Sequence, residues 1–314
     1  MAPAAAPVTR LALLASSIAL AAAIACQGDP GYKGRSSDDW IAALRDSSAD
    51  RRVEAAVALG EVLKLDPHSD RAIAALVTAL RDTVDAVRVT AGYALASERV
   101  RADAAMPGIV ELLDDQTHPR VRQAGITMLA RFGPRAAPYS LQPLVRALVD
   151  PAAGVRVAAA DALAALGRGA APEALPALER RLDDPDAEVR AAVLAAMVTL
   201  GAPPASLRPR LTAALSDPTP DVRARAAELI ARSGLPDAPA LLERALGDGH
   251  PGVRRAALYA LGTLGTRAGP ALPAIRRALA DPDSTVRRAA EGTALLAEGK
   301  PLPADTHGHP GRVR

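Results

Sequence analysis

Hydrophobic positions recur at helical spacing along nearly the whole chain, in stretches that come in pairs. One apolar stretch, residues 139–149, ends at Asp150-Pro151. A second starts near Val155, keeps its apolar residues on one stripe at steps of three and four, and ends at Gly167. This spacing predicts two amphipathic helices. Asp-Pro suits the turn between them, because proline cannot extend the first helix, and Gly167 fits a left-handed C-terminal cap. No stretch alternates with period two, so we expect an all-α fold without a sheet.

The helix pair is repeated eight times. Aligned on a Val-Arg step at the head of the second helix, the copies place an arginine at steps of 36, 34, 34, 34, 33, 31 and 33 residues. These arginines are Arg52, Arg88, Arg122, Arg156, Arg190, Arg223, Arg254 and Arg287. A period of this size predicts a stacked array rather than a globule with one central core. The first copy has Arg51 where the others have valine, as expected for a terminal repeat with one face in water.

Paired helices at this period, Asp-Pro turns and the Val-Arg step resemble HEAT repeats, in the short form also called phycobilin-lyase-like repeats. A proline near the start of the first helix fits that family, at Pro107, Pro143, Pro176, Pro209, Pro239 and Pro273. The resemblance covers about Ser37 to Gly299 and implies a right-handed α-solenoid of about eight two-helix repeats. It says little about function, because the matching residues are those that build the stack.

The periodic arginines have two interpretations. They could form a basic stripe for nucleic acid. Alternatively, each could pair with a turn aspartate, so that a ladder of ion pairs joins neighbouring repeats while the guanidinium also reaches turn carbonyls. The aspartates are Asp46, Asp82, Asp115, Asp150, Asp184, Asp217, Asp248 and Asp281. Because every repeat carries both partners, we favour the ladder.

The first 26 residues have the pattern of an export signal. Arg10 is the only charge before an apolar run at 11–24, which is too short to span a bilayer and fits the core of a signal peptide. The run leads into Cys26, the only cysteine, in a sequence that resembles a bacterial lipobox. The resemblance implies lipidation of Cys26 and anchoring at the cell envelope. Gln27, rather than aspartate, then favours the outer membrane. The alternatives are a buried cysteine or a signal peptide cut at another site.

These features predict four regions. Residues 1–25 would be a lipoprotein signal peptide, 26–36 a polar tether, 37–299 the repeat array and 300–314 a disordered tail. With no further cysteine, the mature chain cannot form an internal disulfide.

Composition and motifs offer little sign of catalysis. No histidine precedes a glutamate, so the di-iron pattern of the HEAT-like deoxyhypusine hydroxylases is missing. His307 and His309 could chelate a metal, but two ligands in a Pro/Gly-rich tail make a weak site. We therefore expect no cofactor, no metal and no enzymatic activity.

Charges are nearly balanced, at 38 Lys and Arg against 35 Asp and Glu, and no block of like charge appears. A DNA-binding array could use Arg225, Arg232, Arg255 and Arg288, but exported proteins rarely meet DNA and Glu228 lies among these arginines, so nucleic acid is not the expected partner.

The exposed side of the second helices is the candidate binding face. The sixth residue after the repeat valine should point away from the core, and this register contains Tyr93, Thr127, Asp161, Glu228 and Tyr259. Small uncharged residues predominate in repeats four and five, and Arg255 and Arg288 lie toward the C-terminal end. The pattern favours a groove for a protein or peptide as strongly as it favours close helix packing with incidental tyrosines.

Three functional hypotheses remain. The first is a monomeric, lipid-anchored adaptor or scaffold that binds another protein or an extended peptide. The second is a purely structural envelope component. The third is an enzyme or enzyme-maturation factor, supported by analogy to lyase-like relatives alone. We favour the first.

Overall fold

The structure is a computed structural model that describes residues 31–96 and 100–302. In these ranges the chain forms helices joined by short turns, and no β-strand is assigned. One isolated bridge links Tyr32 and Arg35. The predicted all-α class is confirmed.

The helices alternate between two layers, as the repeat predicts. The first helices of the repeats are α2 (Ser37–Ala43), α4 (Asp70–Ala79), α6 (Ala102–Glu111), α8 (Ala137–Ala147), α10 (Ala171–Glu179), α12 (Pro204–Ala214), α14 (Ala238–Ala245) and α16 (Leu272–Arg277). The second helices are α3 (Ala49–Leu65), α5 (Asp85–Leu95), α7 (Pro119–Arg131), α9 (Ala153–Ala165), α11 (Ala187–Leu200), α13 (Pro220–Arg232), α15 (Pro251–Leu264) and α17 (Ser284–Ala297). Short 3₁₀ turns join some of them: η1 (Leu112–Asp114), η2 (Gly133–Ala136), η3 (Arg168–Ala170), η4 (Gly265–Ala271) and η5 (Ala278–Ala280).

Local sequence explains where the second helices begin and end. Asp186 caps α11 by accepting hydrogen bonds from the amides of Glu188 and Val189, and Asp283 caps α17 in the same way. At the other end, a glycine with positive φ follows each second helix from α7 to α17: Gly133, Gly167, Gly201, Gly234, Gly265 and Gly299. Gly201 is the left-handed cap of α11, with φ 77 and ψ 39. Gly167 combines φ 79 with ψ −178, which equally requires glycine but is not left-handed helical.

The first helices differ from expectation in where their prolines lie. Pro107, Pro143, Pro176 and Pro209 are inside α6, α8, α10 and α12 rather than at their starts. Each of these helices begins five or six residues before its proline, and that first stretch already carries buried residues such as Met106, Ala174 and Leu207. Each interior proline lacks an N–H donor, so one intrahelical hydrogen bond is missing there.

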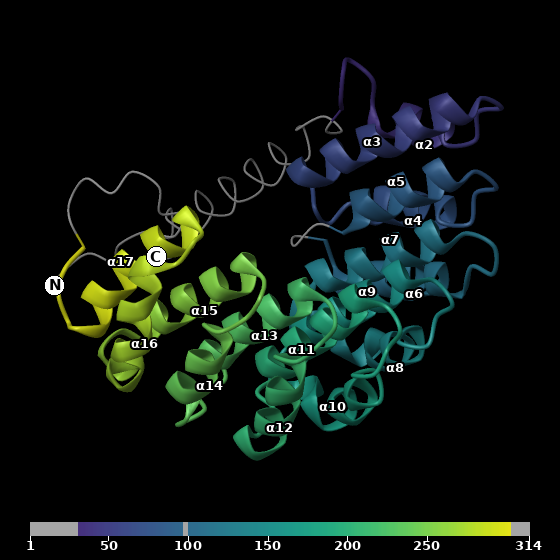
Figure 1. Cartoon of the computed structure of the whole chain (residues 1–314). Coiled ribbons are helices and arrows are strands. Elements are labelled where there is room, and N and C mark those ends of the chain that lie inside the picture. Colours follow the sequence, from purple (N-terminus) through teal and green to yellow (C-terminus); the bar gives the residue numbers. More distant parts are fainter. Residues whose placement is uncertain (1–30, 97–99, 303–314) are drawn as a thin grey trace, which may run out of the picture. The chain divides into compact units, whose positions relative to one another are not determined.

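The chain divides into two compact units, residues 1–112 and 113–314. The described part of unit 1 contains α2 to α6. Here α3 packs against α5, and α2 and α4 cover the pair (Figure 1). Its core contains Trp40, Leu59, Leu63 and Leu76, all almost fully buried.

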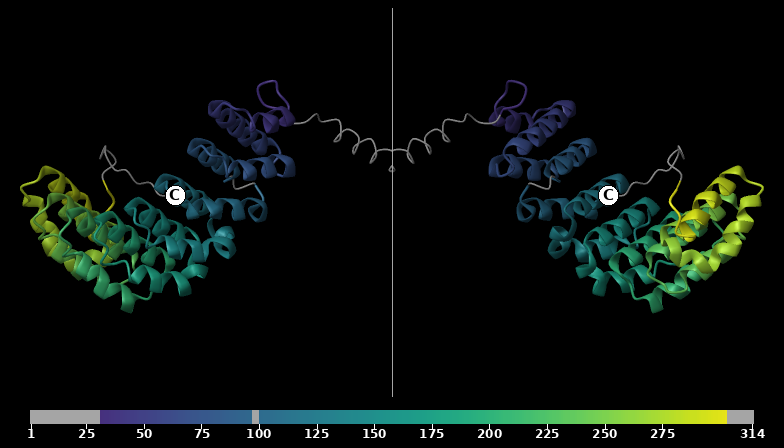
Figure 2. Two further views of the ribbon diagram at one scale, coloured as in Figure 1. Left: turned by 90° about the vertical axis from the view of Figure 1, so that its right-hand side faces the viewer. Right: turned by 90° about the vertical axis from the view of Figure 1, so that its left-hand side faces the viewer.

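Unit 2 contains α7 to α17. Its second helices pack side by side from α7 to α17, and these contacts are far more extensive than those between successive first helices (Figure 1). Buried alanines such as Ala159, Ala160, Ala226 and Ala227 allow this close approach. A layer that packs more tightly than its neighbour lies on the inside of a curved stack, and Figure 2 shows this curvature of unit 2. The exposed side of the second helices in unit 2 is called the inner face below.

Candidate binding surface

The periodic arginines join consecutive repeats. In the middle of unit 2, Arg156 Nε and Nη2 donate to the two carboxylate oxygens of Asp184, one repeat ahead, at 2.9 and 2.7 Å. Its Nη1 donates to the carbonyl oxygen of Asp150, in the turn of its own repeat, at 2.9 Å. Asp184 also accepts from the amide of Asp186 at 3.0 Å. One guanidinium therefore binds two turns, and the Asp184 side chain is only 2% exposed.

Six of the periodic arginines, including Arg156, bind both an aspartate carboxylate one repeat ahead and a turn carbonyl of their own repeat. The pairs are Arg52–Asp82, Arg122–Asp150, Arg156–Asp184, Arg190–Asp217, Arg223–Asp248 and Arg254–Asp281. Burial alone would raise the pKa of Asp184, but the hydrogen bonds from Arg156 and the Asp186 amide outweigh it and lower that pKa. Donation of these hydrogen bonds to Asp184 raises the pKa of Arg156 in turn.

The described contacts of two further periodic arginines also lie at the turns. Arg88 donates to Asp85 of its own helix at 2.7 Å and to the Asp82 carbonyl at 3.1 Å. Arg287, in the last repeat, donates to the carbonyl oxygens of Asp281 and Pro282. The ladder arginines are thus bound to the turns, so they are poorly placed to contact a ligand.

The candidate residues of the sixth register are exposed on the second helices. Tyr93 is 42% exposed on α5 of unit 1, and Tyr259 is 45% exposed on α15 of unit 2. Thr127, Asp161 and Glu228 are exposed on the inner face. The two tyrosines lie in separate units, each at the same place in its own repeat.

Charges on the inner face interact over more than one repeat. Crowding by protein atoms raises the pKa of Asp161 on α9, and Arg225 on α13 acts in the opposite direction. Because α11 lies between these two helices, the interaction is the one expected across a concave surface. Arg225 also pairs with Glu228 at 2.8 Å.

The C-terminal end of the inner face has exposed cations. Arg255 on α15 and Arg288 on α17 occupy the second residue after the repeat valine, and both are exposed. In the part of the chain that the structure describes, neither has an ion-pair partner. At the same position α9, α11 and α13 have uncharged Val157, Ala191 and Ala224. At this register the inner face is therefore uncharged on α9, α11 and α13 and basic on α15 and α17.

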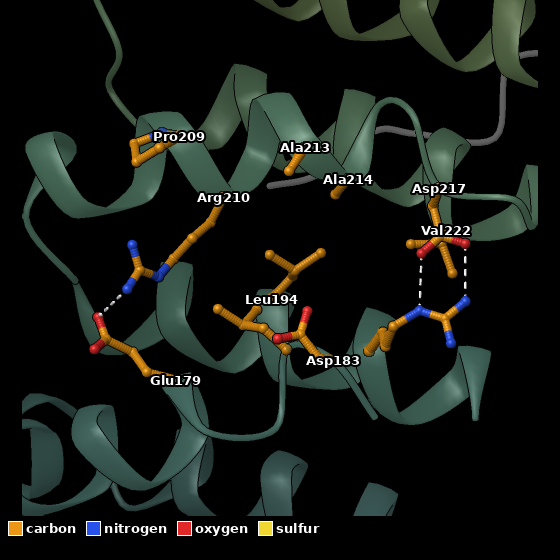
Figure 3. Close-up of a pocket in the computed structure, with 11 residues that line it drawn as sticks. Glu179, Asp183, Leu194, Pro209, Arg210, Ala213, Ala214, Asp217 and Val222 are labelled. Carbon is orange, nitrogen blue, oxygen red and sulfur yellow. Dashed lines mark hydrogen bonds and ion pairs between the residues drawn. The ribbon is translucent and has the colours of Figure 1, made fainter. Parts of the chain in front are cut away.

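Hollows occur on the opposite side, between consecutive first helices. A cleft of about 430 Å³ between α10 and α12 contains the Arg210–Glu179 pair at 3.2 Å and the ladder pair Arg190–Asp217 (Figure 3). Similar clefts of about 460 and 160 Å³ lie at α14–α16 and α2–α4. Because the clefts share one place in the repeat, they follow from the spacing of the first helices, and the guanidinium groups in Figure 3 already have carboxylate partners.

The remaining candidates have local roles or lie outside the described residues. His250 Nδ1 accepts from the Gly252 amide at 3.2 Å and caps α15. Cys26, the predicted signal peptide and the His307/His309 tail are outside the described ranges.

Among described residues, no group of three or more His, Cys, Asp or Glu could hold a metal ion. None of the described helices has the length and apolar character needed to cross a bilayer.

Sequence reasoning missed the start of the array. Residues 31–36, expected to belong to the tether, include a turn that packs on the first repeat. Trp40 Nε1 donates to the Tyr32 carbonyl at 3.0 Å, and the Arg35 guanidinium lies 4.9 Å from the Trp40 ring centroid. The isolated tryptophan in the first helix was the available signal. At the other end, a Cβ added at Gly292 would lie 3.6 Å from the Leu302 side chain, so Leu302 lies against the inner face of α17.

Comparisons with known proteins agree with this architecture. The family model described as HEAT repeats matches residues 37–130, 106–198 and 208–295. No curated protein matches the chain. Among solved structures, the Escherichia coli protein YibA aligns with a TM-score of 0.56 and 19% identity over 82% of this chain and 91% of that chain. An engineered protein aligns with a TM-score of 0.49 and 21% identity over 84% and 79%. The likeness to YibA concerns the fold.

Proposed function

Because the chain belongs to the HEAT-repeat family, we propose that it is a non-enzymatic interaction scaffold that binds another polypeptide along the inner face of its second helices. HEAT repeats fit a protein-interaction scaffold, since a stack of helix pairs offers an extended surface. The observation that carries the proposal is the inner face of unit 2, where Tyr259 and Arg255 are exposed on α15 and the register of Arg255 is uncharged on α9, α11 and α13. Tyrosine is a favoured anchor because it buries a rigid, amphipathic ring at low entropic cost.

Tyr259→Glu is expected to weaken capture of the native partner by about tenfold or more, since a buried aromatic anchor contributes at least about 1–2 kcal/mol. The melting temperature should change little, because the ring is already exposed in the unbound protein. A photo-crosslinking amino acid introduced at position 259 in intact cells would identify the partner, and the glutamate variant would then be measured against it.

Tyr139→Glu is the matched control. Tyr139 is 39% exposed on α8, a first helix on the other side of the stack, so this variant should bind the partner normally. Equal capture by both variants would favour a purely structural envelope component instead. Copurification of a chromophore would favour a lyase-like role.

We further propose that Cys26 anchors the protein at a bacterial cell envelope, with the outer membrane favoured. The support is the apolar run at 11–24 ending in small residues before the single cysteine. Two or more acyl chains on one residue would hold firmly, at about 0.8 kcal/mol per buried methylene.

Cys26→Ser should move the protein from the membrane fraction to the soluble fraction or leave an unprocessed precursor. Fractionation combined with intact-mass measurement checks this. A mutant that stays in the membrane at the normal mature mass would rule out lipidation at Cys26.

A further inference from the structure

Two adjacent helices place exposed guanidinium groups in the same register of the inner face. Arg255 and Arg288 are both exposed, and neither has a carboxylate partner among the described residues. The preceding residue in each case, Arg254 or Arg287, is instead bonded to the turns. Neighbouring arginines of one helix thus have different environments, and only the second of each pair is open to a ligand.

Leu302, which follows α17, restricts where a ligand can lie. Leu302 lies over Gly292, which occupies the Tyr259 register on α17. On α17, Arg288 is therefore more accessible to a ligand than position 292, one helical turn later. A ligand that reaches α17 would follow the row from Arg255 to Arg288, with Tyr259 four residues from Arg255 on the same side of α15.

The charge pattern favours a polypeptide over a nucleic acid. A continuous chain of phosphates along the inner face would pass Glu228 and Asp161, which are exposed there, and would be repelled by both. An extended peptide can place acidic side chains only where the arginines are and present neutral residues to Val157 and Ala191 on α9 and α11. Arginine also suits carboxylates, because its planar fork can donate two parallel hydrogen bonds.

We propose that the inner face of unit 2 binds an extended peptide segment whose two acidic side chains, about three residues apart, contact Arg255 and Arg288, and whose small uncharged residues cover α9 and α11. The spacing follows from geometry, since packed helices lie about 8–10 Å apart and an extended chain advances about 3.3 Å per residue. This inference rests on the proposed function and names the chemistry of the partner.

Fluorescence anisotropy with synthetic probes tests the inference. One labelled peptide of about twelve residues carries two glutamates three positions apart, followed by a neutral Gly/Ala/Ser/Val tract. A second has lysines in place of the glutamates, and the third probe is an oligothymidylate of similar length. The purified protein, from residue 27 onward, should bind the glutamate peptide at least about tenfold more tightly than the lysine peptide, with an affinity that falls as salt is added.

The double variant Arg255→Glu/Arg288→Glu should weaken binding of the glutamate peptide by about tenfold or more. The control Arg146→Glu/Arg180→Glu makes the same change in net charge on α8 and at the end of α10, where both arginines are exposed, and should stay within about twofold. Equal losses in the two variants, or no preference for the glutamate peptide, would overturn the inference. Tighter binding of the oligothymidylate would point to nucleic acid instead.

Crosslinking from position 259 separates this inference from the function on which it rests. If a partner is captured and its crosslinked segment contains the acidic pair, both stand. If the captured segment contains no such pair, the inference fails while the scaffold function stands. If no partner is captured in cells, the scaffold function itself fails.

Discussion

Trp40→Ala is expected to unfold the first repeat and to destabilise unit 1 by about 3–5 kcal/mol, the usual cost of removing a buried tryptophan. Trp40 is 2% exposed, and the turn from Tyr32 to Arg35 packs over it through the indole hydrogen bond and the guanidinium contact. The substitution would leave a cavity and remove the support of that turn. Hydrogen exchange measured by mass spectrometry should show strongly reduced protection in α2 and α3, because terminal repeats of a stack have neighbours on one side only.

Leu65→Ala is the control for this prediction. Leu65 is a large apolar residue in the last turn of α3, but it is 71% exposed, so its truncation should cost no more than about 0.5 kcal/mol. Trp40→Phe should lie between the two, because it keeps most of the buried ring and loses the N–H donor. If Trp40→Ala leaves protection of α2 and α3 unchanged, the turn does not stabilise the first repeat.

Arg156→Ala is expected to destabilise unit 2 by about 1–3 kcal/mol, because it leaves the buried Asp184 carboxylate without its guanidinium partner. The Asp150 carbonyl would lose its hydrogen bond at the same time. Arg225→Ala removes an arginine from the inner face whose described ion pair is with exposed Glu228, and it should cost no more than about 0.5 kcal/mol. Chemical denaturation followed by circular dichroism compares the variants, and equal effects would argue against the ladder as a stabilising element.

The fluorescence of Trp40 adds a control within the same experiment. The chain has one tryptophan, and it lies in unit 1, so its emission reports on that unit. The Arg156 variant should change the circular-dichroism transition of unit 2 more than it changes the fluorescence transition.

The ladder also predicts how stability depends on pH. The folded protein holds the pKa of Asp184 below its ordinary value of 3.8, so below about pH 5 the unfolded chain binds more protons than the folded chain. The contribution of the pair is therefore complete at neutral pH and is lost as pH falls through the folded pKa. Asp82, Asp150, Asp217, Asp248 and Asp281 are shifted in the same direction. Arg156→Ala should lose less stability than the wild-type protein on acidification, because one shifted carboxylate has lost its partner.

Much of the architecture could be predicted from the sequence, because its causes are local and repeated. The helix pairs follow from apolar spacing, and the ends of the second helices follow from glycines that adopt positive φ. The ladder residues were recognisable as types, since Arg156 and Asp184 recur with the repeat. The candidate surface was recognisable as a register, because Tyr259 stands six residues after a buried valine.

Contacts between residues far apart in sequence were decided by the tertiary structure alone. Nothing near Arg156 in the sequence shows that its carboxylate partner belongs to the next repeat while its carbonyl partner belongs to its own. Arg225 on α13 lowers the pKa of Asp161 on α9 across the intervening α11, and this proximity depends on how the second helices pack. Periodicity indicates which side of a helix faces the core. Which charges on the other side remain open to a partner depends on how successive helices pack, and this packing leaves Arg255 and Arg288 exposed.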